Sequence, residues 1–122
     1  MNETEIVESF LSAFNDKDLE RIMSFFAPNA VYHNMPSDPT EGIEAIRTVI
    51  AGYVGAASEI DWETLAIAQV GTTVLTERVD NFVFGTSKVA LPVMGAFEVR
   101  DGKIVAWRDY FDIATWTKQM GN

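Results

Sequence analysis

Three stretches of the chain place polar side chains on stripes that are otherwise apolar. The first is the alternating row Val74, Thr76, Arg78, Asp80, Phe82 and Phe84, with a charged pair in its middle. The second is Val105, Trp107, Asp109 and Phe111, in which the aspartate is the only charged residue. In the third, Tyr32 and Asn34 lie two residues apart and therefore share one face of a short strand.

Two aspartates beside one arginine form a paired set that carries one excess negative charge. A buried carboxylate is costly unless it is paired, and two like charges at close range cannot both ionise cheaply. We therefore expect either Asp80 or Asp109 to hold a proton at neutral pH, with Arg78 bridging them. A protonated acid and an ionised base are the parts of a general acid/base site. Alternatively, Arg78 and Asp80 form a structural ion pair and Asp109 caps a strand end.

Composition and charge exclude several other kinds of chemistry. The chain has 122 residues, 48% of them hydrophobic, as in an ordinary soluble domain. The absence of cysteine excludes thiol nucleophiles and thiolate metal sites, and a single histidine excludes a polyhistidine metal site. A net charge of −9 disfavours binding to nucleic acid or to anionic membranes. No apolar run approaches the ~20 residues of a membrane span, and the acidic N-terminus is unlike a signal peptide, so we expect a cytoplasmic protein.

The spacing of apolar residues predicts helices first and strands later. Helical spacing covers Ile6–Phe14 and then Leu19–Phe26. A third helix is expected over 43–53, with Thr40 as its cap. A period of two then predicts strands at 59–70, 72–84, 88–100 and 103–112, besides a short one at 31–35, and Asp101-Gly102 predicts a tight hairpin.

This order of elements favours an α+β fold, with residues 1–122 as a single domain. We expect a curved, mixed but mostly antiparallel sheet that forms a cone and is covered by three N-terminal helices. The concave face of such a sheet needs covering by the helices or by a ligand. A pocket is therefore expected there, and the polar stripes of three different strands would converge on it.

The same residues carry a resemblance to a known family. The chain resembles the limonene-1,2-epoxide hydrolases, a family within the nuclear-transport-factor-like (SnoaL-like) superfamily of α+β cones. Three segments carry the likeness, in the family's order and at similar separations: Tyr32-His33-Asn34-Met35-Pro36, Thr76-Glu77-Arg78-Val79-Asp80 and Trp107-Arg108-Asp109-Tyr110-Phe111-Asp112. Each motif alone is short, but the likeness covers nearly the whole chain, from Glu5 to Trp116.

The resemblance implies a role for each of five residues. Asp109 is the general base that removes a proton from the attacking water, and Tyr32 and Asn34 hold that water. Asp80 is the general acid that protonates the epoxide oxygen, and Arg78 lies between the two aspartates. Water attacks directly, without a covalent ester, so the expected product is a vicinal diol of trans type.

The resemblance also implies the surroundings of the site. The substrate is a small lipophilic epoxide, cyclic or terpene-like, hydrolysed without a metal or cofactor, and the protein is a homodimer. Family members extend further at both termini, so the C-terminal segment that would close the pocket is expected to be short here. The expected lining, for each of which ordinary core is the alternative, consists of Tyr53, Phe82, Leu91, Val93 and Phe111.

Two other functions remain open at this point. One is a ketosteroid isomerase-like or polyketide cyclase-like enzyme of the same superfamily, which needs no water-holding pair. It is favoured if Tyr32 and Asn34 lie far from Asp109. The other is a non-catalytic ligand-binding module, favoured if Asp80 and Asp109 are exposed and unpaired.

Overall fold

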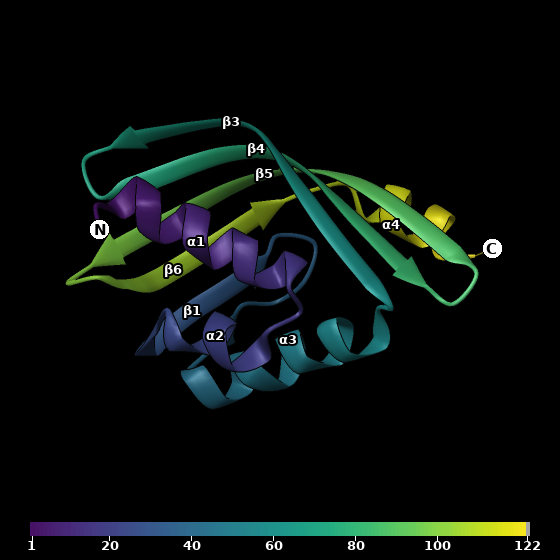
Figure 1. Cartoon of the computed structure of the whole chain (residues 1–122), viewed down its shortest axis with the longest axis horizontal. Coiled ribbons are helices and arrows are strands. Elements are labelled where there is room, and N and C mark those ends of the chain that lie inside the picture. Colours follow the sequence, from purple (N-terminus) through teal and green to yellow (C-terminus); the bar gives the residue numbers. More distant parts are fainter. Residues whose placement is uncertain (122) are drawn as a thin grey trace.

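In a computed structural model, which describes residues 1–121, the polypeptide forms one open six-stranded sheet with helices packed on one face (Figure 1). The strand order is β2-β1-β6-β5-β4-β3, with β1 and β6 parallel and the other neighbours antiparallel. The α+β class and the mixed, mostly antiparallel sheet are therefore confirmed. The elements are α1 (Glu3–Asn15), α2 (Leu19–Ser24), β1 (Phe26–Asn34), β2 (Thr40–Glu41), α3 (Ile43–Ala56), β3 (Glu59–Val70), β4 (Thr73–Phe84), β5 (Ser87–Arg100), β6 (Lys103–Tyr110) and α4 (Ile113–Gln119).

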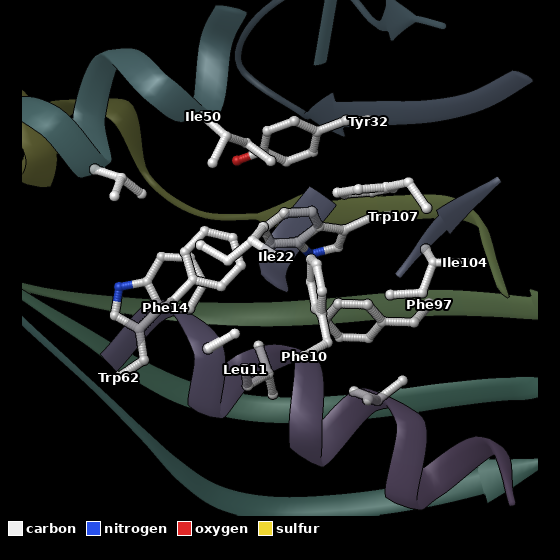
Figure 2. Close-up of a cluster of buried hydrophobic side chains, with 14 of the residues drawn as sticks. Phe10, Leu11, Phe14, Ile22, Tyr32, Ile50, Trp62, Phe97, Ile104 and Trp107 are labelled. Carbon is white, nitrogen blue, oxygen red and sulfur yellow. The ribbon is translucent and has the colours of Figure 1, made fainter. Parts of the chain in front are cut away.

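Helix α1 closes one end of the concave face. It begins with a capping box, in which the Asn2 side chain accepts from the Glu5 amide at 2.8 Å and the Glu5 carboxylate accepts from the Asn2 amide at 3.0 Å. Its buried face carries Phe10 and Phe14 one turn apart. The Phe10 ring meets Trp107 of β6 edge to face, with centroids 5.0 Å apart (Figure 2). This aromatic cluster therefore packs α1 against β6 within the buried core.

The hairpin between β5 and β6 sets the register on which the site depends. Asp101 and Gly102 both have positive φ, 49° and 77°, as a tight two-residue turn requires, so the predicted hairpin is confirmed. The resulting pairing places Gly95 of β5 opposite Asp109 of β6, and opposite Thr76 of β4 on its other side. The polar residues of β4 and those of β6 therefore flank Gly95 from its two neighbouring strands.

Two expectations near the start of the chain are wrong. Thr40 does not cap α3, because it pairs with Tyr32 in the short strand β2; the cap is Gly42, which has a φ of 90° and makes no side-chain cap bond. The short strand begins at Phe26, whereas the apolar spacing predicts this residue in the second helix, which ends at Ser24. A proline has no N–H to donate, and the ladder with β6 shifts between Phe26 and Val31, around the exposed Pro28.

The C-terminal region also differs from expectation. The last strand ends at Tyr110, and α4 follows it as a fourth helix, capped by the Asp112 side chain, which accepts from the Ala114 amide at 2.9 Å. The alternation in β6 is broken as well: Ile104 is fully buried and Val105 only partly, because the ladder with β5 shifts between Glu98 and Val99. No helix within residues 1–121 is long and apolar enough to cross a membrane.

Candidate active site

A cavity of about 210 Å³ opens on the concave face, between the strands, α3 and α4. Nine of the ten residues predicted from the sequence line it; the tenth, Arg78, is 1% exposed and lies between the two aspartates of the lining. The ten predicted site residues therefore lie together in the fold. The lining consists of Tyr32, Asn34, Ser37, Tyr53, Trp62, Asp80, Phe82, Leu91, Val93, Asp109, Phe111, Ile113 and Trp116.

Arg78 uses all five of its N–H groups. Its Nε and Nη2 atoms donate to the two oxygens of Asp80, at 3.0 and 2.9 Å. Nη2 also donates to Asp109 Oδ2 at 2.8 Å, while Nη1 donates to Asp109 Oδ1 at 3.3 Å and to the Thr76 hydroxyl at 3.0 Å. Burial lowers the pKa of the guanidinium, but the charges of Asp109 and Asp80, together with their hydrogen bonds, raise it by more. The arginine is thus a fixed cation that ties two strands' carboxylates together.

Asp109 is surrounded by donors and still has a free acceptor position. Besides the two bonds from Arg78, its Oδ1 accepts from the indole N–H of Trp107 at 2.7 Å. A carboxylate offers about four acceptor positions, so Oδ2 keeps one that can receive a proton donor from the cavity. The side chain is almost fully buried yet lines the cavity, which is the position that a proton acceptor needs.

The pKa of the Asp80 carboxyl is higher than that of an ordinary aspartate. Its burial raises the pKa of its carboxyl from 3.8 to about 6, against the opposing charge and hydrogen bonds of Arg78 and with a further contribution from the negative charge of Asp109. The carboxyl therefore gains and loses its proton close to neutrality. The expectation that one of two buried aspartates would readily hold a proton agrees with this environment.

Tyr32 and Asn34 reach the cavity from β1, which runs parallel to β6. Tyr32 is paired with Trp107 and Asn34 with Asp109 in the ladder, so these side chains alternate to the same face. The Tyr32 ring stacks on Trp107 with centroids 4.2 Å apart and an interplanar angle of 11° (Figure 2). The two polar groups therefore lie on the same side of the sheet as Asp109, rather than remote from it.

Aromatic rings enclose the charged cluster. The guanidinium carbon of Arg78 lies 5.3 Å from the ring centroid of Trp62 and 5.9 Å from that of Phe97, which allows cation–π attraction on both sides. Trp62, opposite Asp80 in the β3–β4 ladder, also lines the cavity. Its indole nitrogen is the one buried side-chain nitrogen or oxygen within residues 1–121 that has no hydrogen-bond partner. Figure 2 shows this nitrogen on the side of the ring away from Phe10.

Several parts of the site escaped the sequence analysis. Trp116 lines the cavity from α4 and packs edge to face on Phe82 at 5.6 Å, but no apolar repeat long enough to predict α4 precedes it. Trp107 has no predicted role in the site, although its indole N–H donates to Asp109. Gly95 has the clearest missed signal, since an isolated glycine inside a strand often marks a close approach. A Cβ there would lie 2.4 Å from Arg78 Nη1 and 2.7 Å from Asp109 Oδ1.

Comparisons with known proteins agree with this geometry. A family model described as the limonene-1,2-epoxide hydrolase catalytic domain matches residues 1–121. The chain is 36% identical over 110 residues to epoxide hydrolase EphG of Mycobacterium tuberculosis, covering 88% of this chain and 71% of that protein. An M. tuberculosis LEH-like epoxide hydrolase structure superposes with a TM-score of 0.86 at 32% identity, covering 96% and 87% of the two chains. Bal32a, from a soil-derived mobile gene cassette, shares the fold with a TM-score of 0.83 at 22% identity, over 97% and 98%.

Proposed function

The chain belongs to the limonene-1,2-epoxide hydrolase family and is an epoxide hydrolase, and from this premise we propose that it adds water directly to small lipophilic epoxides, giving vicinal diols of trans type. The observation that carries this proposal is the buried bridge in which Arg78 holds Asp80 and Asp109 together. Both carboxylates line one cavity while their bridging cation lies outside the lining. The pair can therefore exchange protons with a bound substrate.

In this mechanism Asp109 is the general base. Its unused acceptor position on Oδ2 accepts a proton from a water molecule in the cavity as the water oxygen bonds to the epoxide carbon. Tyr32 and Asn34, on the same face as Asp109, hold that water and direct a lone pair at the carbon. Positioning of this kind replaces a bimolecular encounter by a reaction within one complex.

Asp80 is the general acid. As the C–O bond of the epoxide breaks, the protonated carboxyl transfers its proton to the leaving oxygen, so no free alkoxide forms. A pKa of about 6 suits this task, because the acid is populated near neutrality and transfers its proton readily. The step leaves a proton on Asp109 and a charge on Asp80. The proton then returns to Asp80, and Arg78 remains bonded to both carboxylates throughout.

The arrangement of strands supports attack from behind the breaking bond. Asp80 lies on β4 and Asp109 on β6, and β5 separates these strands. Base and acid can thus stand on opposite sides of a bound epoxide ring, which neighbouring residues of one strand could not do. Backside attack inverts the carbon and gives the trans-type diol from a cyclic epoxide.

The substrate class follows from the rest of the lining. Apart from the catalytic polar groups, the cavity walls are largely apolar, and a volume of about 210 Å³ is small for a ligand site. Such a cavity binds its ligand mainly by burial of apolar surface. We therefore propose cyclic or terpene-like epoxides as substrates, held by Tyr53, Phe82, Leu91, Val93 and Phe111.

The observed geometry disfavours the alternatives. An isomerase or cyclase needs no water-holding pair, whereas Tyr32 and Asn34 share the cavity with Asp109. A binding module would leave the aspartates exposed and unpaired, whereas Asp80 and Asp109 are each 3% exposed and bound to one arginine.

A hydrolysis assay tests the proposed function. We expect the purified protein to convert limonene oxide and cyclohexene oxide to diols, and Asp109→Asn to lower the rate by ~10²–10⁴-fold while remaining folded. Asp61→Asn, the same change on an exposed strand face, is the matched control and should keep the wild-type rate. Absence of diol from any small epoxide, with the protein folded, would overturn the proposed substrate class.

We also infer that two copies pair through the outer face of the sheet. Helices α1, α2 and α3 cover the other face (Figure 1). On the outer side, Leu75 is 40% and Met94 52% exposed, and the Val79–Pro92 pair follows Met94 along the β4–β5 ladder, with Glu77 as the charged residue among them. Large apolar side chains exposed on one face of a sheet are typical of an interface. Sedimentation equilibrium should give a dimer for the wild type and a monomer for Met94→Glu; a monomeric wild type at every concentration would refute the pairing.

A further inference from the structure

Tyr53 brings a second phenol hydroxyl into contact with Tyr32. The two hydroxyl oxygens lie 3.1 Å apart, and Tyr53 reaches this position from the last turns of α3, whereas Tyr32 lies on β1. Figure 2 shows the Tyr32 hydroxyl directed toward the side on which α3 and Ile50 lie. In the proposed mechanism Tyr53 is only a wall of the substrate cavity, and its hydroxyl has no role.

The ring positions of both tyrosines are fixed by packing. Tyr32 stacks on Trp107 at 4.2 Å, and the same indole donates to Asp109 at 2.7 Å. The Tyr53 ring lies nearly parallel to the Phe14 ring, with centroids 6.1 Å apart, and it meets the Phe82 ring edge to face at 6.0 Å. Because the rings are held, the remaining freedom of each phenol is the torsion of its O–H bond.

The direction of the bond between the two hydroxyls decides what Tyr32 offers to the cavity. A phenol has one proton to donate and can accept at its oxygen. If Tyr32 donates to Tyr53, its only proton is used and it can only accept from a water molecule. If Tyr53 donates to Tyr32, the Tyr32 proton stays available to the cavity.

Charge selects the second arrangement. Burial is the largest cause that raises the pKa of Tyr32, and the charge of Asp109 is the next, so the phenol remains protonated beside the base. Tyr32 lies on β1, beside the strand that carries Asp109, whereas Tyr53 reaches the cavity from α3. The Tyr32 proton is therefore drawn toward the side of the carboxylates, and the Tyr53 proton toward the Tyr32 oxygen.

We propose that Tyr53 is a positioning residue, which donates a hydrogen bond to the Tyr32 hydroxyl and so aims the Tyr32 proton at the attacking water. This inference rests on the proposed function and adds to it a residue and a direction. The water then accepts from Tyr32 with one lone pair and donates one proton to Asp109 and the other to the side-chain oxygen of Asn34. Its second lone pair is left pointing at the epoxide carbon.

Steady-state kinetics of hydroxyl-deletion variants test the inference. We expect Tyr53→Phe to lower kcat by about tenfold, the effect of one hydrogen bond, with KM changed by less than about twofold. Tyr32→Phe should have a larger effect on kcat. In the Tyr32→Phe background, adding Tyr53→Phe should change kcat no further, because the group through which Tyr53 acts is gone. Tyr110→Phe makes the same chemical change at an exposed tyrosine outside the cavity and should match the wild type.

Three results would overturn the inference. They are a wild-type kcat for Tyr53→Phe, an effect confined to KM, and an equal loss of kcat with and without the Tyr32 hydroxyl. The last two would mean that Tyr53 acts on the substrate as a wall of the cavity. These outcomes differ from failure of the proposed function, in which the wild type itself forms no diol. Thermal unfolding of each variant separates a loss of kcat from a loss of folded protein.

Discussion

Replacing Gly95 by alanine would place a methyl group in the space that Arg78 and Asp109 share. Gly95 lies on the central strand of the site, opposite Thr76 on one side and Asp109 on the other. A Cβ atom built there lies 2.4 Å from Arg78 Nη1, 2.7 Å from Asp109 Oδ1 and 3.0 Å from the Thr76 hydroxyl. Ordinary contacts begin near 3.4 Å, so all three atoms must move or the strand must shift.

The size of the effect follows from these distances. Restoring an ordinary contact requires Arg78 Nη1 to retreat by about 1 Å, and a displacement of that size at a catalytic group costs about 10²-fold in rate. Three atoms are crowded together, and they belong to a network whose members cannot move independently. We therefore expect kcat to fall by at least about 10²-fold. Overpacking of a buried site costs about 1–3 kcal/mol of unfolding free energy, which leaves the fold intact.

The assay compares epoxide hydrolysis and urea unfolding for Gly95→Ala and for a matched control. Gly52→Ala makes the same change on the exposed side of α3, where a Cβ meets nothing within 4 Å. It should keep the wild-type rate and raise the stability by about 0.5–1 kcal/mol, since glycine is unfavourable inside a helix. A Gly95→Ala enzyme with wild-type kcat would refute the claim that the close approach of Arg78 and Asp109 is needed.

The remaining predictions concern the charged bridge and the C-terminal helix. Arg78→Lys keeps the charge but removes the planar fork that holds both carboxylates, so initial rates should fall at least ~100-fold. Urea unfolding should show a loss of about 1–3 kcal/mol, because buried carboxylate oxygens lose their donors. A rate within tenfold of wild type would contradict this. For Asp80, kcat/KM should decline as the pH rises through about 6, because the acid loses its proton there. Because the pKa of Asp80 is raised in the folded state, its contribution to stability is full below pH 3.8 and is lost as the pH rises through about 6. The free energy of unfolding of the wild type, relative to that of Asp80→Asn, should therefore fall over this pH range. A constant difference between the two proteins would be inconsistent with the raised pKa. Trp116→Ala opens the wall at Phe82 and should raise KM with kcat nearly unchanged, whereas an equal loss in kcat would place α4 in the chemistry.

Much of the site could be predicted because strand alternation is a local property. Arg78 and Asp80 share a face whatever the rest of the chain does, and the same holds for Tyr32 and Asn34. That the three stripes meet in one cavity depends on register across β1, β6, β5 and β4, which no local pattern fixes. The resemblance to a family supplied this step.

Other features depend on contacts that the sequence does not reveal. Residues 113–119 form α4, a helix of seven residues without a buried member, held by Gln119 bonds to the backbone of Ala90 and by the Trp116 ring. Thr40 is a good helix cap by type, but pairing with Tyr32 takes it into a strand. In both cases tertiary contacts override local preference.

The source of the oxygen atom added to the epoxide tests the central claim most directly. The measurement is a single turnover in ¹⁸O-labelled water, with the enzyme in excess over cyclohexene oxide and with Asp109→Asn as the comparison. Direct attack by water predicts that the first-turnover diol carries one ¹⁸O atom, and that the variant forms almost none. A first-turnover diol with unlabelled oxygen would mean that a protein carboxylate attacks the epoxide, and would contradict the assignment of Asp109 as a general base.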